Sequence, residues 1–254
     1  MYVERFAELV EIMKRLRREC PWDREQTPES LRQYILEEAY ETVEAIDAGN
    51  WEELKKELGD LLLQIVFQAE IAEERGRFTL EDVIQHINQK LIQRHPHVFG
   101  GVEVKDADHV KENWERIKYH QENRRSVLEG VPRHLSALLR AQRLQDKAAQ
   151  VGFDWDDPRG VLEKIQEELR ELDKAIHAQA REKMEEEIGD MLFSLVNLSR
   201  FLKINAEDAL RTTINKFIAR FHYIEQKLSE QNKSIREASF KEMDALWEEA
   251  KNRE

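Results

Sequence analysis

The sequence predicts an all-α protein made of two tandem helical bundles that arose by internal duplication. Apolar residues recur at three- and four-residue spacings, and no stretch alternates with a convincing period of two. The 254 residues include nine Gly and five Pro, and 36% are charged, a composition typical of long solvated helices. An acidic block also occurs twice, and the chain length suits two domains.

The acidic block repeats at a constant offset of 130 residues, as from Glu38 to Glu168. The acidic pairs are Glu37 and Glu167, Glu38 and Glu168, Glu41 and Glu171, Glu57 and Glu187, and Asp60 and Asp190. This internal similarity predicts a first domain over residues 1–123, a connection over 124–134 and a second domain over 135–254.

In the first half, the apolar spacing predicts helices over about residues 2–19, 28–48, 51–75, 80–94 and 110–123. Start signals precede the second, third and fourth of these: Thr27 with Pro28, Asn50 with Glu53, and Thr79 with Asp82. Pro fits the first turn of a helix, and an acid three residues after the cap is typical of a capping box.

The second half follows the same order after the connecting segment. Helices are predicted over about residues 135–150, 159–178, 181–203, 206–230 and 239–252. Asp157 with Pro158 repeats the Thr27–Pro28 signal at the same offset, and Asn205 is the expected cap of the fourth helix.

The overall charge and the apolar runs exclude several classes of protein. A formal net charge of −12 argues against nonspecific binding to nucleic acid, which needs a basic surface. No apolar run is long enough to cross a membrane, and the N-terminus lacks the pattern of a signal peptide. The single cysteine, Cys20, fits a reducing compartment, so a cytoplasmic location is expected.

Acids on exposed helix faces are expected in a chain with 52 Asp and Glu. Only the spacing of the acids in the repeated block can therefore indicate a metal site. Glu168 and Glu171 share one helix face, as do Glu187 and Asp190 on the following helix. A short connection makes these helices antiparallel neighbours, with Gly189 permitting close approach. Four carboxylates converging there would repel one another unless they were protonated or bridged by cations.

An all-oxygen site selects a hard divalent cation, Mg²⁺ first and Mn²⁺ second. A di-iron bundle requires Glu-x-x-His on two helices, and that motif does not occur in this sequence. Zinc is disfavoured because Cys and His are not grouped with the acids. The same reasoning predicts a second, weaker metal site in the first domain, made of Glu38, Glu41, Glu57 and Asp60.

Cationic residues near the acids are candidates for binding phosphate. They are Lys164, Lys183, Lys216, Arg220 and Lys251, with Trp247 one turn before the last. Each alone is more often a surface residue, and Trp247 alone is more often a packing residue. The first half repeats part of the set as Lys90 with Arg94 and Trp114 with Lys118, but Tyr34 and Glu53 replace Lys164 and Lys183. Phosphate contacts are stronger when they are charge-assisted, so this difference favours the second domain as the one that binds phosphate.

The duplicated acidic motif, with Arg94-His95-Pro96-His97-Val98-Phe99-Gly100 after its first copy and Val151-Gly152-Phe153-Asp154-Trp155 before its second, resembles the MazG family. The resemblance covers essentially the whole chain. It implies an all-α nucleoside triphosphate pyrophosphohydrolase that forms NMP and pyrophosphate with Mg²⁺, tolerates different bases and assembles as a homodimer. The family is also linked to control of stress nucleotides such as ppGpp.

Carried onto this chain, the resemblance assigns Glu168, Glu171, Glu187 and Asp190 as catalytic metal ligands. Phosphate contacts would come from Lys164, Lys183, Lys216 and Arg220, and the nucleotide would lie near Trp247 and Lys251. Two alternatives stay open. The chain is otherwise a non-enzymatic helical adaptor or dimerisation module, or a relative with narrow substrate choice, such as dUTP or phosphoribosyl-ATP.

Overall fold

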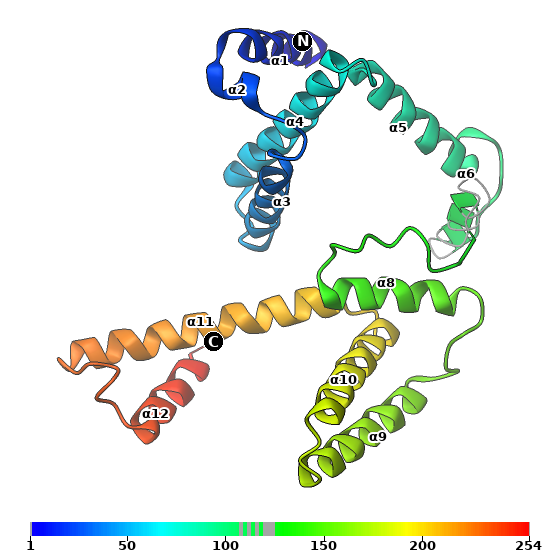
Figure 1. Cartoon of the computed structure of the whole chain (residues 1–254). Coiled ribbons are helices and arrows are strands. Elements are labelled where there is room, and N and C mark those ends of the chain that lie inside the picture. Colours follow the sequence, from blue (N-terminus) through cyan, green and yellow to red (C-terminus); the bar gives the residue numbers. More distant parts are fainter. Residues whose placement is uncertain (1, 107–108, 111–112, 115–116, 119–124, 254) are drawn as a thin grey trace. The chain divides into compact units, whose positions relative to one another are not determined.

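The computed structural model describes residues 2–106, 109–110, 113–114, 117–118 and 125–253 (Figure 1). The regular structure in these residues is helical, which confirms the all-α prediction. The chain divides into two compact units, Met1–Lys118 and Tyr119–Glu254. The predicted connection, residues 124–134, therefore falls in the second unit.

The first unit is built around a pair of packed helices, α3 and α4. Its labelled helices are α1 (Tyr2–Glu19), α2 (Pro21–Glu25), α3 (Arg32–Asp47), α4 (Trp51–Glu74), α5 (Leu80–Arg94) and α6 (Pro96–Phe99). Both α1 and α5 pack on α4. The core between them consists of Met13, Leu31, Val66, Phe67 and Ile71. This core holds one end of α4 in place. The first set of acids lies on the α3–α4 pair.

The second unit contains two packed helix pairs, which are visible in Figure 1. Its helices are α8 (Ala137–Ala149), α9 (Pro158–His177), α10 (Arg181–Phe201), α11 (Ala206–Glu230) and α12 (Phe240–Lys251). Helix α9 packs on α10, α12 packs on α11, and α8 contacts both α10 and α11. The acids predicted to bind metal lie on the first pair.

The duplication is also visible in which residues are buried. Eight buried residues of the first unit have a buried counterpart 130 positions later, among them Leu31 with Val161, Ala45 with Ala175, Val66 with Val196, and Glu57 with Glu187. Of these four pairs, three are apolar, and the fourth is a glutamate in each unit. The two units therefore bury a carboxylate at the same place in the same helix pair.

The predicted start of α3 is wrong. Thr27 and Ser30 form a closed turn, in which the Ser30 N–H donates to Thr27 Oγ1 at 3.2 Å and the Thr27 N–H donates to Ser30 Oγ at 2.9 Å. This turn satisfies its own donors, so Pro28 lies before the helix, which begins at Arg32. The matching signal in the second unit does start α9, where Asp157 caps the helix and Pro158 is its first residue.

Two short helices, α2 and α6, lie in segments that were expected to be irregular. Each begins at a proline, which favours a first helical turn without requiring a longer helix. The predicted helix over 110–123 lies partly outside the described residues, but His109, Val110, Asn113, Trp114, Ile117 and Lys118 are helical. Within the described chain, every helix is too short or too polar to be a membrane-spanning segment.

Candidate functional site

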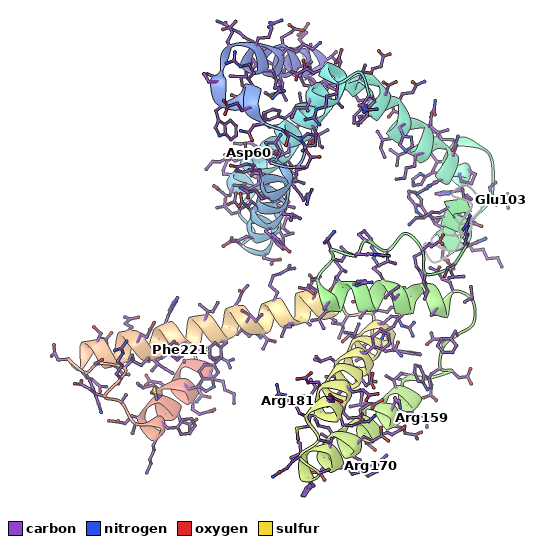
Figure 2. The ribbon with its side chains drawn as sticks, in the orientation of Figure 1. Asp60, Glu103, Arg159, Arg170, Arg181 and Phe221 are labelled. Atoms are coloured by element: carbon purple, nitrogen blue, oxygen red, sulfur yellow. The ribbon has the colours of Figure 1, made fainter. Side chains whose placement is uncertain are left out.

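Three of the four predicted ligands in the second unit converge between α9 and α10. Carboxylate oxygens of Glu168, Glu171 and Glu187, the second carboxylate cluster, lie within 4.8 Å of one another. Glu168 is 3% exposed and Glu187 is 7% exposed. Figure 2 labels Arg170 on α9 and Arg181 at the start of α10, near the turn that makes the two helices antiparallel. This turn brings the two Glu-bearing faces together.

Asp190 is exposed and lies outside the second carboxylate cluster. Four carboxylates were predicted to converge, and within one chain three of them do. The reason given for Gly189 is wrong, because a Cβ added there, or at Gly59, would meet no described atom within 4 Å apart from the adjoining backbone of its own helix. These glycines are not required for the packing of α9 on α10 or of α3 on α4.

The second carboxylate cluster carries unfavourable charge density in the absence of a bound cation. Burial raises the pKa of Glu187, and the negative charges of Glu171 and Glu168 raise it further, whereas Lys183 lowers it. Lys164 Nζ donates to Glu167 Oε1 at 3.1 Å and lies 2.9 Å from Glu168 Oε1. The hydrogen bond to Glu168 raises the pKa of Lys164, so this ammonium group is charged.

The first unit contains an equivalent group, the first carboxylate cluster, made of Glu38, Glu41 and Glu57, again with oxygens within 4.8 Å. Glu57 is 7% exposed, and its Oε2 has no hydrogen-bond partner among the described residues. Burial raises the pKa of both Glu38 and Glu57, with further contributions from neighbouring acids. Asp60 is exposed and outside the cluster, although its charge contributes to both shifts.

Both clusters fit a hard divalent cation. The donors are carboxylate oxygens, which Mg²⁺ and Mn²⁺ prefer. Buried acids at this separation repel one another, and a cation between them would relieve that repulsion. The unpartnered Glu57 Oε2 supports this conclusion, because a buried polar atom without a partner is costly. Either cluster can therefore supply three ligands to one ion.

An ion pair beside each cluster has opposite polarity in the two units. In the second unit Lys183 pairs with Glu186 at 2.6 Å, and in the first unit Lys56 pairs with Glu53 at 2.7 Å. Lys183 and Glu53 occupy equivalent positions. Lys183 lowers the pKa of Glu187, whereas Glu53 raises the pKa of Glu57. The same position therefore stabilises the charged form of the buried glutamate in one unit and destabilises it in the other.

The remaining predicted nucleotide contacts, Lys216, Arg220, Trp247 and Lys251, lie on α11 and α12 and are called the α11–α12 set. The Arg220 guanidinium stacks 5.3 Å from the centre of the Trp247 ring. In the described chain, α12 contacts α11 and neither α9 nor α10. The helix packing within one chain therefore does not bring Trp247 and Lys251 to the carboxylates.

Two aromatic residues of this region were missed from the sequence. Phe217 lies 5.3 Å from Trp247 and stacks on Phe221 at 5.9 Å. Phe221, labelled in Figure 2, lies on α11 close to α12. The sequence feature that could have identified them is the four-residue spacing of two aromatic residues, which places both on one helix face beside Arg220. Phe217 supports the ring of Trp247 from the α11 side, and Phe221 stacks on Phe217.

The first unit repeats the stacked pair. Arg94 lies 5.5 Å from the centre of the Trp114 ring, and His95 contacts the same ring edge-on at 4.8 Å. Arg94 is buried, so this cation–π contact is shielded from water and holds the end of α5 against Trp114. Both units thus pair an arginine with a tryptophan four residues before a lysine.

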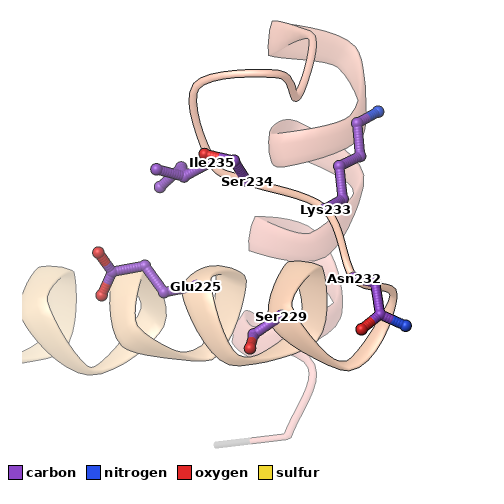
Figure 3. Close-up of a pocket in the computed structure, with 6 residues that line it drawn as sticks. All are labelled: Glu225, Ser229, Asn232, Lys233, Ser234 and Ile235. Atoms are coloured by element: carbon purple, nitrogen blue, oxygen red, sulfur yellow. The ribbon is translucent and has the colours of Figure 1, made fainter.

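A separate pocket of about 430 Å³ lies at the turn between α11 and α12 (Figure 3). It is lined by Glu225, Ser229, Asn232, Lys233, Ser234 and Ile235. Lys233 is paired with Glu242 at 2.6 Å. The lining includes none of the predicted site residues, and no buried charge points to a ligand there.

Comparison with known proteins agrees with the duplicated architecture. The model of the MazG nucleotide pyrophosphohydrolase domain matches twice, over residues 26–99 and 157–224. The nucleoside triphosphate pyrophosphohydrolase/pyrophosphatase MazG of Thermotoga maritima is 49% identical over 250 residues, covering 97% of this chain and 95% of that protein. The nucleoside triphosphate pyrophosphohydrolase of Escherichia coli K12 is 41% identical and covers 97% of each chain. The uncharacterized protein YabN of Bacillus subtilis is 45% identical over 92% of this chain and 49% of its own length.

Proposed function

The chain belongs to the MazG nucleotide pyrophosphohydrolase family, and we propose that its second unit cleaves nucleoside triphosphates between the α- and β-phosphates. The products are a nucleoside monophosphate and pyrophosphate, and the required cation is Mg²⁺, with Mn²⁺ as a substitute. The observation that carries the assignment to this unit is the second carboxylate cluster with Lys164 and Lys183 beside it. The first unit has the acids without these cations.

In this proposal Glu168, Glu171 and Glu187 hold the cation, and Asp190 joins them from one turn further along α10. Held by these carboxylates, Mg²⁺ would supply positive charge for phosphate oxygens and would lower the pKa of a nearby water. Lys164 and Lys183 donate charge-assisted hydrogen bonds to phosphate oxygens, which stabilises the charge that develops on the leaving pyrophosphate. Glu168 or Glu171 accepts the proton from the attacking water.

The α11–α12 set provides the remaining contacts to the nucleotide. Lys216 and Arg220 bind phosphate, while Trp247, backed by Phe217, offers a ring near the base. Stacking does not select between bases because every base has a π-face, which is consistent with broad base tolerance. Control of nucleotide pools or of stress nucleotides is part of the proposal and rests on the family alone.

We also propose a homodimer, in which the second chain supplies the nucleotide contacts that one chain does not bring to its own carboxylates. Six apolar side chains of the α9–α10 pair are between about two-fifths and three-fifths exposed: Leu162, Leu169, Ile176, Ile188, Leu192 and Leu195. A face of this kind marks an interaction surface, and α12 does not reach the acids within its own chain. A second copy covers the apolar face and brings an α11–α12 set to the carboxylates.

The dimer is tested by sedimentation of the wild-type chain and of Leu192→Glu. The wild type is expected to sediment as a dimer and the variant as a monomer, because a charge cannot be buried in an apolar interface without a partner. Lys174→Glu, at an exposed polar position of α9, is the control and should stay dimeric. A wild-type chain that sediments as a monomer at micromolar concentration would exclude the homodimer.

The reaction is tested by product analysis with each ribo- and deoxynucleoside triphosphate, with dUTP and with phosphoribosyl-ATP, in Mg²⁺ and in EDTA. We expect monophosphate and pyrophosphate from most substrates in Mg²⁺ and no product in EDTA. Turnover of one substrate alone would identify a narrow-substrate enzyme. Diphosphate plus phosphate would refute α,β-cleavage, and no turnover of any substrate would favour a non-enzymatic adaptor.

A further inference from the structure

Lys164 contacts a carboxylate oxygen that a metal ion in the second carboxylate cluster would also bind. Its Nζ lies 2.9 Å from Glu168 Oε1, an oxygen of a glutamate in the second carboxylate cluster, whose side chain is 4% exposed. The Lys164 side chain is itself 38% exposed, so its ammonium reaches the cluster from the solvent side. Without a metal ion, this lysine neutralises the most buried acid of the site.

Among the described residues, the first carboxylate cluster has no such cation. Its position equivalent to Lys164 is Tyr34, which packs against the core and meets Trp22 edge-on at 6.2 Å. No described lysine or arginine forms an ion pair with Glu38, Glu41 or Glu57, and Glu57 Oε2 has no hydrogen-bond partner among the described residues. The two clusters therefore offer similar acids to a metal ion but differ in whether a cation of the chain already competes for them.

We propose that Lys164 is a built-in counter-ion that couples metal binding to nucleotide binding in the second unit, while the first carboxylate cluster binds a divalent cation alone. The proposal rests on the proposed function for its metal assignment. A divalent ion that enters the second cluster meets the like charge of Lys164 and has to displace it from Glu168. A triphosphate gives the displaced ammonium a new anionic partner, so the nucleotide and the metal each favour the binding of the other.

This arrangement makes Lys164 a positioning residue with two alternative partners, the Glu168 carboxylate and a phosphate oxygen. Glu168 stays paired with Lys164 as long as no substrate is bound. In this proposal the metal ion binds the second cluster together with the nucleotide. The first cluster, which lacks the lysine, shows how a similar set of acids binds metal without it.

The test is titration of the full-length chain with Mn²⁺, in which electron paramagnetic resonance reports the free ion. A triphosphate whose α,β-bridging oxygen is replaced by a methylene group serves as the uncleavable nucleotide. Glu41→Gln with Glu57→Gln in the background removes the first cluster from the titration. In this background we expect weak Mn²⁺ binding without the nucleotide and binding at least about 10-fold tighter with it, the scale of one nearby charge in a partly exposed site.

Lys164→Met is expected to raise the nucleotide-free affinity for Mn²⁺ by about 10-fold and to remove most of the enhancement by nucleotide. Lys164→Arg keeps the charge and should retain weak nucleotide-free binding. Lys174→Met removes a charge from an exposed position on the same helix and should change neither affinity. In the wild-type chain, one Mn²⁺ per chain should bind without nucleotide, and Glu41→Gln with Glu57→Gln should abolish it.

The two proposals fail in different ways. If Mn²⁺ binds the second cluster but Lys164→Met behaves like Lys174→Met, the counter-ion role is wrong and the proposed metal site stands. If the second cluster binds no Mn²⁺ with or without the nucleotide analogue, both the metal-dependent reaction and the role of Lys164 are wrong.

Discussion

The helix pairs α3–α4 and α9–α10 carry the same acids and differ in the cations around them. Each pair holds three glutamates whose oxygens lie within 4.8 Å, and each buries the glutamate on its second helix. Lys164 in α9 is replaced by Tyr34 in α3, and the Lys183–Glu186 ion pair is reversed to Glu53–Lys56. The carboxylate geometry is therefore similar in the two units, and the proposed assignment of catalysis to the second unit rests on the placement of lysine.

The largest expected difference concerns the acids themselves. Glu171→Ala should lower kcat/KM by about 100-fold or more, the scale seen when one charge-stabilising group is lost from an active site. The equivalent Glu41→Ala should leave kcat/KM within about 3-fold of the wild type, because the first unit lacks the lysines that bind a triphosphate. Steady-state pyrophosphate release measures both. A loss of activity in Glu41→Ala equal to that in Glu171→Ala would end the functional distinction between the units.

A smaller difference is expected for the phosphate-binding lysines. Lys216→Ala should raise KM by about 10-fold, since a hydrogen bond to a charged group contributes roughly 1.5–3 kcal/mol. Lys90→Ala should leave KM unchanged; Lys90 and Arg94 in the first unit have the same four-residue spacing as Lys216 and Arg220. Initial rates over a range of ATP concentrations separate KM from kcat. If Lys90→Ala raises KM as much as Lys216→Ala, the first unit contributes to binding the substrate that is cleaved.

The reversed ion pair can be exchanged between units. Lys183→Glu with Glu186→Lys gives the second unit the polarity of the first, and it should raise the pKa of Glu187 because Lys183 no longer lowers it. A carboxyl whose pKa is raised in the folded state binds more protons there than in the unfolded chain, so stability falls as pH rises through that pKa. In EDTA, Tm should therefore fall more steeply in the variant than in the wild type above the ordinary glutamate pKa of 4.5.

The converse exchange, Glu53→Lys with Lys56→Glu, supplies the control. It should lower the pKa of Glu57, since Glu53 raises it in the wild type, and so should make Tm less dependent on pH. Calorimetric scans in EDTA from pH 4.5 upward measure this dependence, because the pKa of both buried glutamates is raised above that ordinary value. Equal pH profiles for both exchanges would show that the ion pairs do not act on the buried glutamates.

The smallest predicted effect is one in which the two units should agree. Gly59→Ala and Gly189→Ala should each raise the free energy of unfolding by about 0.5–1 kcal/mol, because alanine favours a helix and no atom lies within 4 Å of either new Cβ. Urea denaturation measures this change. If Gly189→Ala is destabilising while Gly59→Ala is stabilising, a partner chain packs against α10 at this glycine.

The sequence by itself determined the helical class, the duplication and most helix bounds, because the apolar period and the acidic repeat are local or periodic properties. It also identified the glutamates of both clusters, since positions three residues apart share a helix face whatever surrounds them. The start of α3 was missed because Thr27 and Ser30 satisfy each other's backbone groups. The Thr27–Pro28 pair in the sequence does not show how the side chains of Thr27 and Ser30 are oriented.

Only the tertiary structure decided which acids meet and which cations accompany them. It placed Asp190 and Asp60 outside the clusters, left Glu57 Oε2 without a hydrogen-bond partner in the part of the chain that is described, and put Lys164 on Glu168. It also separated α12 from the carboxylates within one chain. The physical reason is that these outcomes depend on how one helix is rotated against another, and the spacing within each helix does not fix that rotation.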